Sequence, residues 1–236
     1  MGKVIAETFA ARGATVVVND RTDSEALREL AGKIGGHTAV ADVSNRDEVI
    51  KMFKGIEGSV GSVDVLISNH AYMSMGAFVG YDHEDWWKVV NTNLSGTFWL
   101  IQSALDGMRK RKAGRIVVIC SGWGVIGWPE ATAYSASKAG LISLVKTLGR
   151  ELGPENIVVN GIAPGVVDTP QLQVDADAAK VSLAQIHSLY AEDIPLGRIG
   201  LPIEIAQTAA LLADFRIRSL VGQIVQVNGA EIRGRV

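Results

Sequence analysis

Several features that would narrow the class of this protein are scarce in its sequence. Cys120 is the only cysteine, so the chain cannot form an internal disulfide, and a reducing compartment such as the cytoplasm is expected. The 23 Lys and Arg residues nearly balance the 25 Asp and Glu residues, and the net charge of −2 gives no general attraction to nucleic acid or anionic lipid. No apolar run approaches the roughly 18 residues that cross a bilayer. We therefore expect a cytoplasmic protein with no nucleic-acid or membrane partner.

Histidine is also rare, and the four histidines are His37, His70, His83 and His187. Their spacing is not that of a metal site, so no metal is expected. The 236 residues are 47% hydrophobic and 20% charged, the balance of a globular domain that can bury a core without staples. We expect a single domain over residues 1–236, in which a polar, proline-bounded stretch at about 169–195 forms a substrate loop.

Strand and helix patterns alternate along the whole chain. Strands are expected at 15–19, 38–41, 63–67, 115–120, 157–163 and 224–227, and helices at 1–10, 24–34, 44–53, 82–108 with a break near Asn93, 133–152 and 202–212. The first strand is β-branched and apolar on both faces, which predicts a buried position. Repeated strand–helix units of this length predict an α/β fold. We expect a doubly wound, Rossmann-type, mostly parallel sheet with helices on both faces.

Sheets of this kind bind ligands beyond the carboxyl ends of their strands. The residues at these positions are small or polar, namely Asp20, Asp42, Asn69, Ser121 and Pro164-Gly165. Each of them alone is a common turn residue, and turn chemistry explains any single one. Their presence after five strands predicts a ligand site along this edge of the sheet.

Tyr134 and Lys138 are four residues apart in a predicted helix, so a phenol and an ammonium share one helix face. This spacing alone is more often a surface pair. In a catalytic setting the nearby cation favours the phenolate and makes Tyr134 a candidate acid–base group. Ser121 lies thirteen residues earlier at a strand end, where its hydroxyl can reach the same substrate oxygen if the following loop folds back.

These residues are part of a set of motifs in which the sequence resembles the short-chain dehydrogenase/reductase family over essentially its whole length. The matching elements, in chain order, are Trp86 with Asn93-Leu94-Ser95-Gly96, Ser121 with Tyr134-x-x-x-Lys138, Pro164-Gly165 with Thr169, and residues 195–206. Each element alone is weak evidence, whereas all of them in order and at the family's spacing are specific. The resemblance implies an NAD(P)-dependent oxidoreductase that interconverts a secondary alcohol and a ketone.

The resemblance also implies a role for each catalytic residue. Tyr134 would be the general acid or base at the substrate oxygen, and Lys138 would favour its phenolate and hold the nicotinamide ribose. Ser121 would hydrogen-bond to the substrate oxygen, and Asn93 would hold a water that links Lys138 to solvent. These donors would stabilise the charge that develops on the substrate oxygen during hydride transfer.

NAD is the expected cofactor. Asp20 stands where family members that prefer NAD carry an acidic residue, which accepts hydrogen bonds from the ribose hydroxyls and repels a 2′-phosphate. Arg21 beside it keeps NADP as the alternative. The cofactor-binding residues that the resemblance implies are Gly2, Asp20, Asp42, Val43, Asn69, Ala71, Tyr134, Lys138, Pro164, Gly165, Val167 and Thr169.

The sequence departs from the family pattern in three places. Ser68-Asn69-His70-Ala71 stands in place of Asn-Asn-Ala-Gly and puts a bulky His70 near the adenosine, and Asn228-Gly229-Ala230 stands in place of Asp-Gly-Gly. The family's first strand and glycine-rich turn would precede this sequence, and only the last glycine of that turn is present, as Gly2. We therefore expect a sheet without one central strand and without most of its phosphate cradle. Our hypothesis is that Met1 is an internal methionine of that turn.

The sequence leaves substrate and assembly open. Trp123, Trp128 and Tyr72 could line an apolar or aromatic pocket for a small alcohol or ketone, or they could pack inside the protein or at a subunit interface. The resemblance implies a homodimer or homotetramer. The alternative function is a catalytically silent or weakly nucleotide-binding family member that serves in subunit association or ligand sensing. A third reading is use of the same residues for epimerisation or dehydration.

Overall fold

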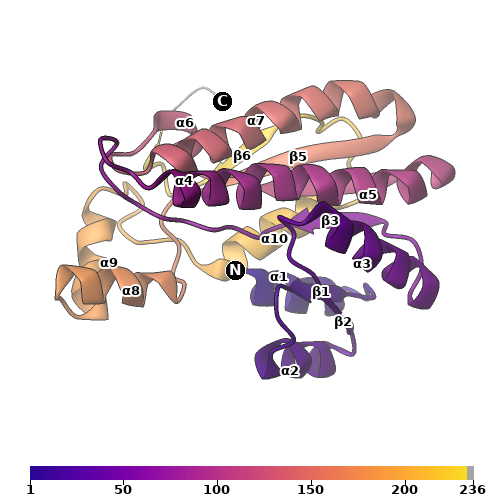
Figure 1. The fold of residues 1–236 in the computed structure, drawn as a ribbon, viewed down its shortest axis with the longest axis horizontal. Coiled ribbons are helices and arrows are strands. Elements are labelled where there is room, and N and C mark those ends of the chain that lie inside the picture. Colours follow the sequence, from indigo (N-terminus) through magenta and orange to yellow (C-terminus); the bar gives the residue numbers. More distant parts are fainter. Residues whose placement is uncertain (233–236) are drawn as a thin grey trace.

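The computed structural model describes residues 1–232, and its strands confirm the α/β fold class. The strands are β1 (Val17–Asp20), β2 (His37–Val40), β3 (Val65–Ser68), β4 (Gly114–Ile119), β5 (Ile157–Pro164) and β6 (Ile224–Val227). Within the described residues they form two sheets, a two-stranded sheet of order β1-β2 and a four-stranded sheet of order β3-β4-β5-β6, and all neighbours are parallel (Figure 1).

Helices cover both faces of the four-stranded sheet. They are α1 (Gly2–Ala10), α2 (Glu25–Ile34), α3 (Arg46–Ser59), α4 (His83–Val90), α5 (Gly96–Arg111), α6 (Trp123–Ile126), α7 (Thr132–Leu152), α8 (Gln171–Ala179), α9 (Leu183–Glu192) and α10 (Pro202–Leu212). Helices α3, α5 and α7 share one hydrophobic core with the sheet, and α1 and α10 share a second core on its other face. Within the described residues, no helix combines the length and apolar character needed to cross a membrane.

Local signals in the sequence account for several helix boundaries. The Ser24 hydroxyl accepts a hydrogen bond from the Leu27 amide at 3.2 Å and begins α2, which ends at Gly35 in the left-handed region. Asn45 caps α3 in the same way. Pro202 is the first residue of α10, where its missing N–H costs no helical hydrogen bond.

The burial expected for the first strand is wrong. Residues 15–19 were expected to form a strand buried on both faces, but in β1 only Val18 is buried, and Asn19 and Asp20 are exposed. By contrast, every residue of β4 and of β5 is buried. The physical reason is that, in the described part of the chain, β1 pairs only with β2, whereas β4 and β5 each lie between two strands under helices on both faces.

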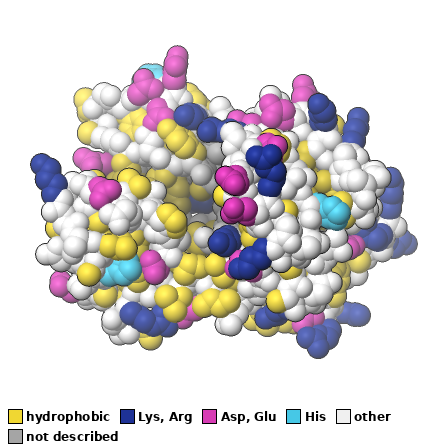
Figure 2. All heavy atoms as spheres, turned by 90° about the horizontal axis from the view of Figure 1, so that it is seen from below, with side chains coloured by type: hydrophobic (Ala, Val, Ile, Leu, Met, Phe, Trp, Pro, Cys, Tyr) yellow, Lys and Arg dark blue, Asp and Glu magenta, His cyan; other side chains and the backbone are white. Residues whose placement is uncertain are grey.

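A cavity of about 1060 Å³ separates the two sheets. It is lined by residues of β1 and β3 and by residues of α1, α2 and α3. It lies between β1 and β3, which do not pair with each other among the described residues. From the side of α2, Figure 2 shows a hollow, with hydrophobic side chains on its floor, between the parts that contain α2 and α8–α9.

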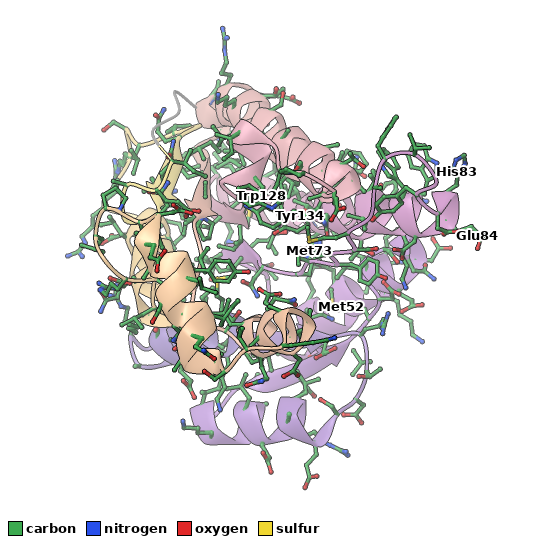
Figure 3. The ribbon with its side chains drawn as sticks, turned by 90° about the vertical axis from the view of Figure 1, so that its left-hand side faces the viewer. Met52, Met73, His83, Glu84, Trp128 and Tyr134 are labelled. Atoms are coloured by element: carbon green, nitrogen blue, oxygen red, sulfur yellow. The ribbon has the colours of Figure 1, made fainter. Side chains whose placement is uncertain are left out.

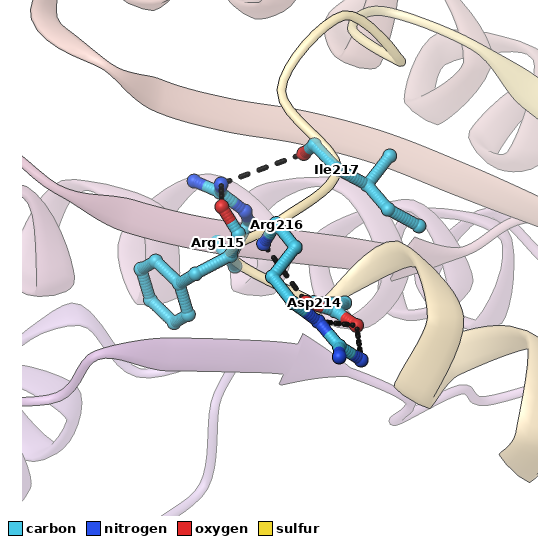
Figure 4. Close-up of polar contacts among 5 residues, drawn as sticks. Arg115, Asp214, Arg216 and Ile217 are labelled. Carbon is cyan, nitrogen blue, oxygen red and sulfur yellow. Dashed lines mark hydrogen bonds and ion pairs between the residues drawn. The ribbon is translucent and has the colours of Figure 1, made fainter.

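Arg115, the second residue of β4, is 1% exposed and binds the segment that follows α10. Its guanidinium donates to the carbonyl oxygens of Phe215 at 3.2 Å and Ile217 at 3.5 Å, and it lies 4.4 Å from the centroid of the Phe215 ring (Figure 4). Burial lowers the pKa of Arg115. Arg216 pairs with Asp214 at 2.6 Å in the same segment. These contacts hold the chain between α10 and β6 against the amino end of β4.

Candidate active site

Tyr134 and Lys138 lie on the first two turns of α7, beside the carboxyl end of β4. The Lys138 ammonium is 5.5 Å from the centroid of the Tyr134 ring, as the spacing of four residues on a helix requires. Lys138 is 2% exposed, and its ammonium donates to the carbonyl oxygen of Ile119 at 2.8 Å. A buried cation is therefore fixed beside a phenol at the edge where a ligand site was expected.

Ser121 follows β4 and lies at the start of a loop that folds back toward α7. Its hydroxyl accepts a hydrogen bond from the Trp123 amide at 3.2 Å. The Trp123 ring packs edge-on against the Tyr134 ring, with 5.9 Å between centroids. Ser121 is thus two residues from a side chain that contacts Tyr134, and its loop packs against α7 through Trp123.

An aromatic wall extends this site outward. Trp123 and Trp128 are stacked with 5.1 Å between centroids and an interplanar angle of 1°, and Trp128 is 47% exposed. Figure 3 shows Trp128 and Tyr134 in the same part of the molecule, joined through Trp123. Tyr72, the third aromatic residue of the expected pocket, is tied to α4 instead, because its hydroxyl donates to Asp85 at 2.7 Å.

Asn93 lies in a π-helical turn, Asn91–Ser95, which breaks the helical stretch where the sequence predicted a break. Its side chain is fully buried and holds the Tyr72 backbone, accepting from the Tyr72 amide at 2.8 Å and donating to the Tyr72 carbonyl at 3.0 Å. It also donates to the Ser137 hydroxyl at 3.0 Å, which in turn donates to the Tyr134 carbonyl at 2.7 Å. Both amide protons of Asn93 are therefore used within the protein.

Sequence reasoning missed the bridging role of Ser137. Its position three residues after Tyr134 on the predicted helix was a usable signal, because that spacing lets a serine hydroxyl reach a carbonyl of the preceding turn. The contact between Ser137 and Asn93 spans 44 residues and carried no local signal.

Three residues expected to bind the cofactor line the cavity between the sheets, namely Gly2, Asp20 and Asn69. The side-chain oxygen of Asn69 is buried and has no hydrogen-bond partner within residues 1–232. A Cβ at Gly2 would lie 2.8 Å from the Asn69 amide nitrogen, so a larger residue there would have to displace the Asn69 side chain. The unpaired Asn69 oxygen beside the backbone of Gly2 fits a polar ligand. These residues fit a nucleotide.

Two carboxylates stand at strand ends near this cavity. Asp20 is exposed and accepts from the Arg21 amide at 2.6 Å. Asp42 accepts from both the amide and the hydroxyl of Ser44, at 2.9 and 2.7 Å. Burial opposes ionisation of Asp42, but its hydrogen bonds from Ser44 and the charge of Arg21 prevail and lower its pKa. Both oriented carboxylates can accept hydrogen bonds from sugar or base groups.

The remaining residues expected to bind cofactor are distributed over three other segments. Pro164 ends β5, and its carbonyl accepts from the Gly122 amide at 3.0 Å, which brings Pro164-Gly165 beside the Ser121 loop. Val167 forms an isolated parallel bridge with Gly200, and Thr169 precedes α8. Further residues expected at the nucleotide are Val43, which is buried, and Ala71, which is exposed.

Cys120 and the metal-ligating types of side chain offer little alternative chemistry at the carboxyl edge of the sheet. Burial raises the pKa of the Cys120 thiol to about 12, which leaves it protonated and unreactive near neutral pH. Among residues 1–232, no three His, Cys, Asp or Glu side chains are grouped so as to hold a metal ion.

Comparisons with known proteins show the family to which the chain belongs. A family model described as "Enoyl-(Acyl carrier protein) reductase" matches residues 1–229. The chain is 34% identical over 234 residues to 3-oxoacyl-[acyl-carrier-protein] reductase FabG of Aquifex aeolicus, covering 97% of this chain and 92% of the relative. It is 36% identical over 231 residues to nodulation protein G of Rhizobium sp., with 97% and 91% covered. It is also 33% identical over 235 residues to the uncharacterized oxidoreductase YmfI of Bacillus subtilis, with 97% and 93% covered. The chain belongs to the short-chain dehydrogenase/reductase family of oxidoreductases.

Proposed function

We propose that this protein interconverts a ketone and a secondary alcohol with a nicotinamide nucleotide. The observation that carries the proposal is the placement of Tyr134, with the buried Lys138 ammonium 5.5 Å from its ring and Ser121 in the adjoining loop. A bound nicotinamide nucleotide supplies or accepts the hydride. The chain's own residues handle the substrate oxygen and its proton.

In the reductive direction, the Tyr134 hydroxyl donates a proton to the carbonyl oxygen of the ketone. The Lys138 ammonium stabilises the phenolate that remains, because an opposite charge nearby favours the ionised form. The Ser121 hydroxyl donates a hydrogen bond to the same oxygen and stabilises its developing charge. Asn93 supports this arrangement through its hydrogen bond to Ser137. We also propose the expected water at Asn93, which would bind without the side-chain amide protons, because both are used within the protein.

We propose NAD as the nucleotide, with the Asp20 carboxylate at the ribose and Asp42 with Val43 beside the adenine. Asn69 and Ala71 would contact the adenosine, and Lys138 would hold the nicotinamide ribose. Pro164, Gly165, Val167 and Thr169 would line the nicotinamide end. Gly2 opens α1 and contributes backbone amides near the phosphates, in keeping with anion binding at helix N-termini.

We propose an apolar or aromatic ketone as substrate, bordered by the Trp123–Trp128 stack and by the loop at 169–195, which carries α8 and α9. Several relatives are named 3-oxoacyl-[acyl-carrier-protein] reductase, so a 3-oxoacyl thioester is the first linear ketone to compare. We further propose a homodimer or homotetramer formed partly through α4 and α5 and partly through α7, since Trp87 and Phe98 on the first two helices are 57% and 39% exposed.

The test is a ketone-reduction assay on the purified protein with NADH and NADPH, using cyclic, aromatic and linear ketones. Tyr134→Phe removes the proton donor but keeps the ring, and we expect turnover to fall by about 10²- to 10⁴-fold. Thermal unfolding of the variant should match that of the wild type. Undiminished turnover in Tyr134→Phe would overturn the proposed mechanism.

A second candidate function is a catalytically silent family member used for subunit association or ligand sensing. The open cavity between β1 and β3 favours it, because part of the nucleotide-binding edge is not continuous. The discriminating measurement is a thermal shift at millimolar NAD and NADH. A thermal shift together with ketone turnover supports the enzyme. The absence of both a shift and turnover supports the catalytically silent protein.

A further inference from the structure

The segment that follows β3 contains His70, whose ring lies between the cavity and the turn that carries Asn93. We propose that His70 is a positioning residue that holds this π-helical turn and thereby fixes Asn93 and the start of α7. This inference rests on the proposed function, because it assigns His70 to the support of Tyr134 and its partners.

The π-helical turn leaves one carbonyl in need of a donor. In an α-helix the Gly96 amide would bond to the carbonyl of Thr92, four residues earlier. Here the Gly96 amide bonds to the carbonyl of Asn91 instead. The His70 Nε2 atom lies 3.0 Å from the Thr92 carbonyl oxygen. Because a carbonyl oxygen only accepts, Nε2 must carry the proton and donate it.

The end of β3 also supports the next carbonyl of the turn. The Thr97 hydroxyl donates to the Asn93 carbonyl at 2.8 Å, and the Ser68 hydroxyl lies 2.9 Å from the Thr97 oxygen. Since the Thr97 proton is already used, Ser68 donates to Thr97. The Thr92 carbonyl is therefore held by His70, two residues beyond β3, and the Asn93 carbonyl by Thr97 of α5, which Ser68 at the end of β3 contacts in turn.

The surroundings of His70 preserve its donor role near neutral pH. Burial, reinforced by the charge of Lys138, lowers the pKa of His70 to about 4, so the ring is neutral and its tautomer is set by the Thr92 carbonyl. Gly96 makes room for the ring, because a Cβ there would lie 3.0 Å from Nε2 and 3.1 Å from Val43. His70 therefore fits a site shaped to hold it.

The link from His70 to the chemistry runs through Asn93. The Asn93 side chain donates to the Ser137 hydroxyl, and Ser137 donates to the carbonyl of Tyr134. Without the His70 donor, the Thr92 carbonyl must find water and the turn must shift. Since a displacement of about 1 Å at a catalytic group can cost on the order of a hundredfold in rate, the effect should appear in kcat.

The experiment compares His70→Gln, His70→Asn and His70→Leu. Gln reaches the position of Nε2 and keeps the donor, Asn is too short to reach it, and Leu keeps bulk without a donor. The first readout is hydrogen–deuterium exchange of residues 91–97 in the chain without nucleotide. We expect about tenfold faster exchange in the Asn and Leu variants, and exchange within about threefold of wild type in the Gln variant.

The second readout is steady-state ketone reduction. In the Asn and Leu variants we expect kcat to fall about ten- to a hundredfold while KM for the ketone stays within about twofold, with rescue by Gln. His83→Gln and His83→Asn are matched controls, because His83 is exposed at the start of α4 and lies away from Tyr134 (Figure 3). They should match the wild type in both readouts.

Wild-type exchange at residues 91–97 in the Asn and Leu variants would overturn the proposal. An equal rise of exchange in β4 and β5 would also overturn it, since that shows general destabilisation. If the Leu variant does not fold, the comparison of Gln with Asn still decides the matter. If the wild-type chain turns over no ketone, the proposed function fails, and the exchange readout still tests how His70 holds the turn.

Discussion

The four-stranded sheet β3–β6 and the two-stranded sheet β1–β2 differ sharply in burial, although all their strand pairs are parallel. Every residue of β4 and β5 is buried, whereas Val18 alone is buried among the eight residues of β1 and β2. The residues of the proposed site follow the same division. Lys138 and Asn93 are almost fully buried at the four-stranded sheet, and Asp20 is exposed at the end of β1.

This difference in burial indicates which part of the proposed site is ordered before a ligand binds. Lys138 and Ser121 are held by hydrogen bonds to Ile119 and Trp123, and the backbone carbonyl of Tyr134 by Ser137, so much of the proposed site is ordered before a ligand arrives. The nucleotide-binding edge adjoins a cavity and a sheet of two strands. Nucleotide affinity should therefore respond to local order around β1 more than the chemical step does.

The largest expected contrast is in backbone hydrogen exchange. Amides of β4 and β5 should exchange only through global unfolding, while those of β1 and β2 should exchange through local opening, because few buried contacts hold them. We expect protection factors about a thousandfold higher in β4 and β5. Exchange followed by mass spectrometry or NMR measures this. Equal protection factors in the two sheets would contradict this expectation. A smaller difference in protection with bound NAD would show that the nucleotide orders β1 and β2.

The same contrast explains what could be predicted from sequence. The apolar run 115–120 predicted β4 to within one residue, and Pro202 predicted the start of α10, because both signals are local. The burial of β1 was not predictable from its own composition, since it depends on which strands lie beside it.

The candidate site also contains features that local sequence predicts and features that depend on distant contacts. The spacing of Tyr134 and Lys138 is a local helical property and could be read from the sequence. The fixing of Asn93 by Tyr72 and Ser137 depends on contacts across 21 and 44 residues, and no local pattern encodes these. The departure at His70 was visible in the sequence, but its hydrogen bond to the turn required the fold.

The next effect in size is a pH dependence of stability that originates at His70, between the two regions. Its pKa is about 4 in the folded chain against 6.5 for an ordinary histidine. Between these values the unfolded chain binds the extra proton, so stability is complete above about pH 6.5 and is lost as the pH falls toward 4. The difference amounts to about 3 kcal/mol.

Urea unfolding of wild type and His70→Gln at pH 7 and pH 4.5 measures this. Glutamine does not ionise, so the variant should lose about 2 to 3 kcal/mol less than the wild type between the two pH values. His83→Gln, at an exposed position, is the control. Identical losses in wild type and His70→Gln would contradict the burial of a neutral imidazole.

At the exposed end of β1, Asp20→Ser should change cofactor preference. Removing the carboxylate removes repulsion of a 2′-phosphate and leaves Arg21 to attract it. We expect kcat/KM with NADPH, relative to that with NADH, to rise about tenfold, which corresponds to about 1.4 kcal/mol. Parallel assays with the two nucleotides measure this. Asp23→Ser, at an exposed position outside the proposed site, is the control, and an unchanged ratio in Asp20→Ser would argue against Asp20 as the selective residue.

The smallest expected effect lies beyond β6, at the edge of the well-packed sheet. Ala230 has a φ of +70°, a left-handed conformation that costs a residue with a Cβ about 1 kcal/mol. Ala230→Gly should therefore raise the free energy of unfolding by about 0.5 to 1 kcal/mol, measured by urea denaturation. Ala11→Gly is the matched control, because Ala11 has a φ of −61° and glycine there should lower stability. The opposite signs of the two variants isolate backbone strain from the general effect of glycine, and a loss of stability in Ala230→Gly would show that the turn after β6 is not strained.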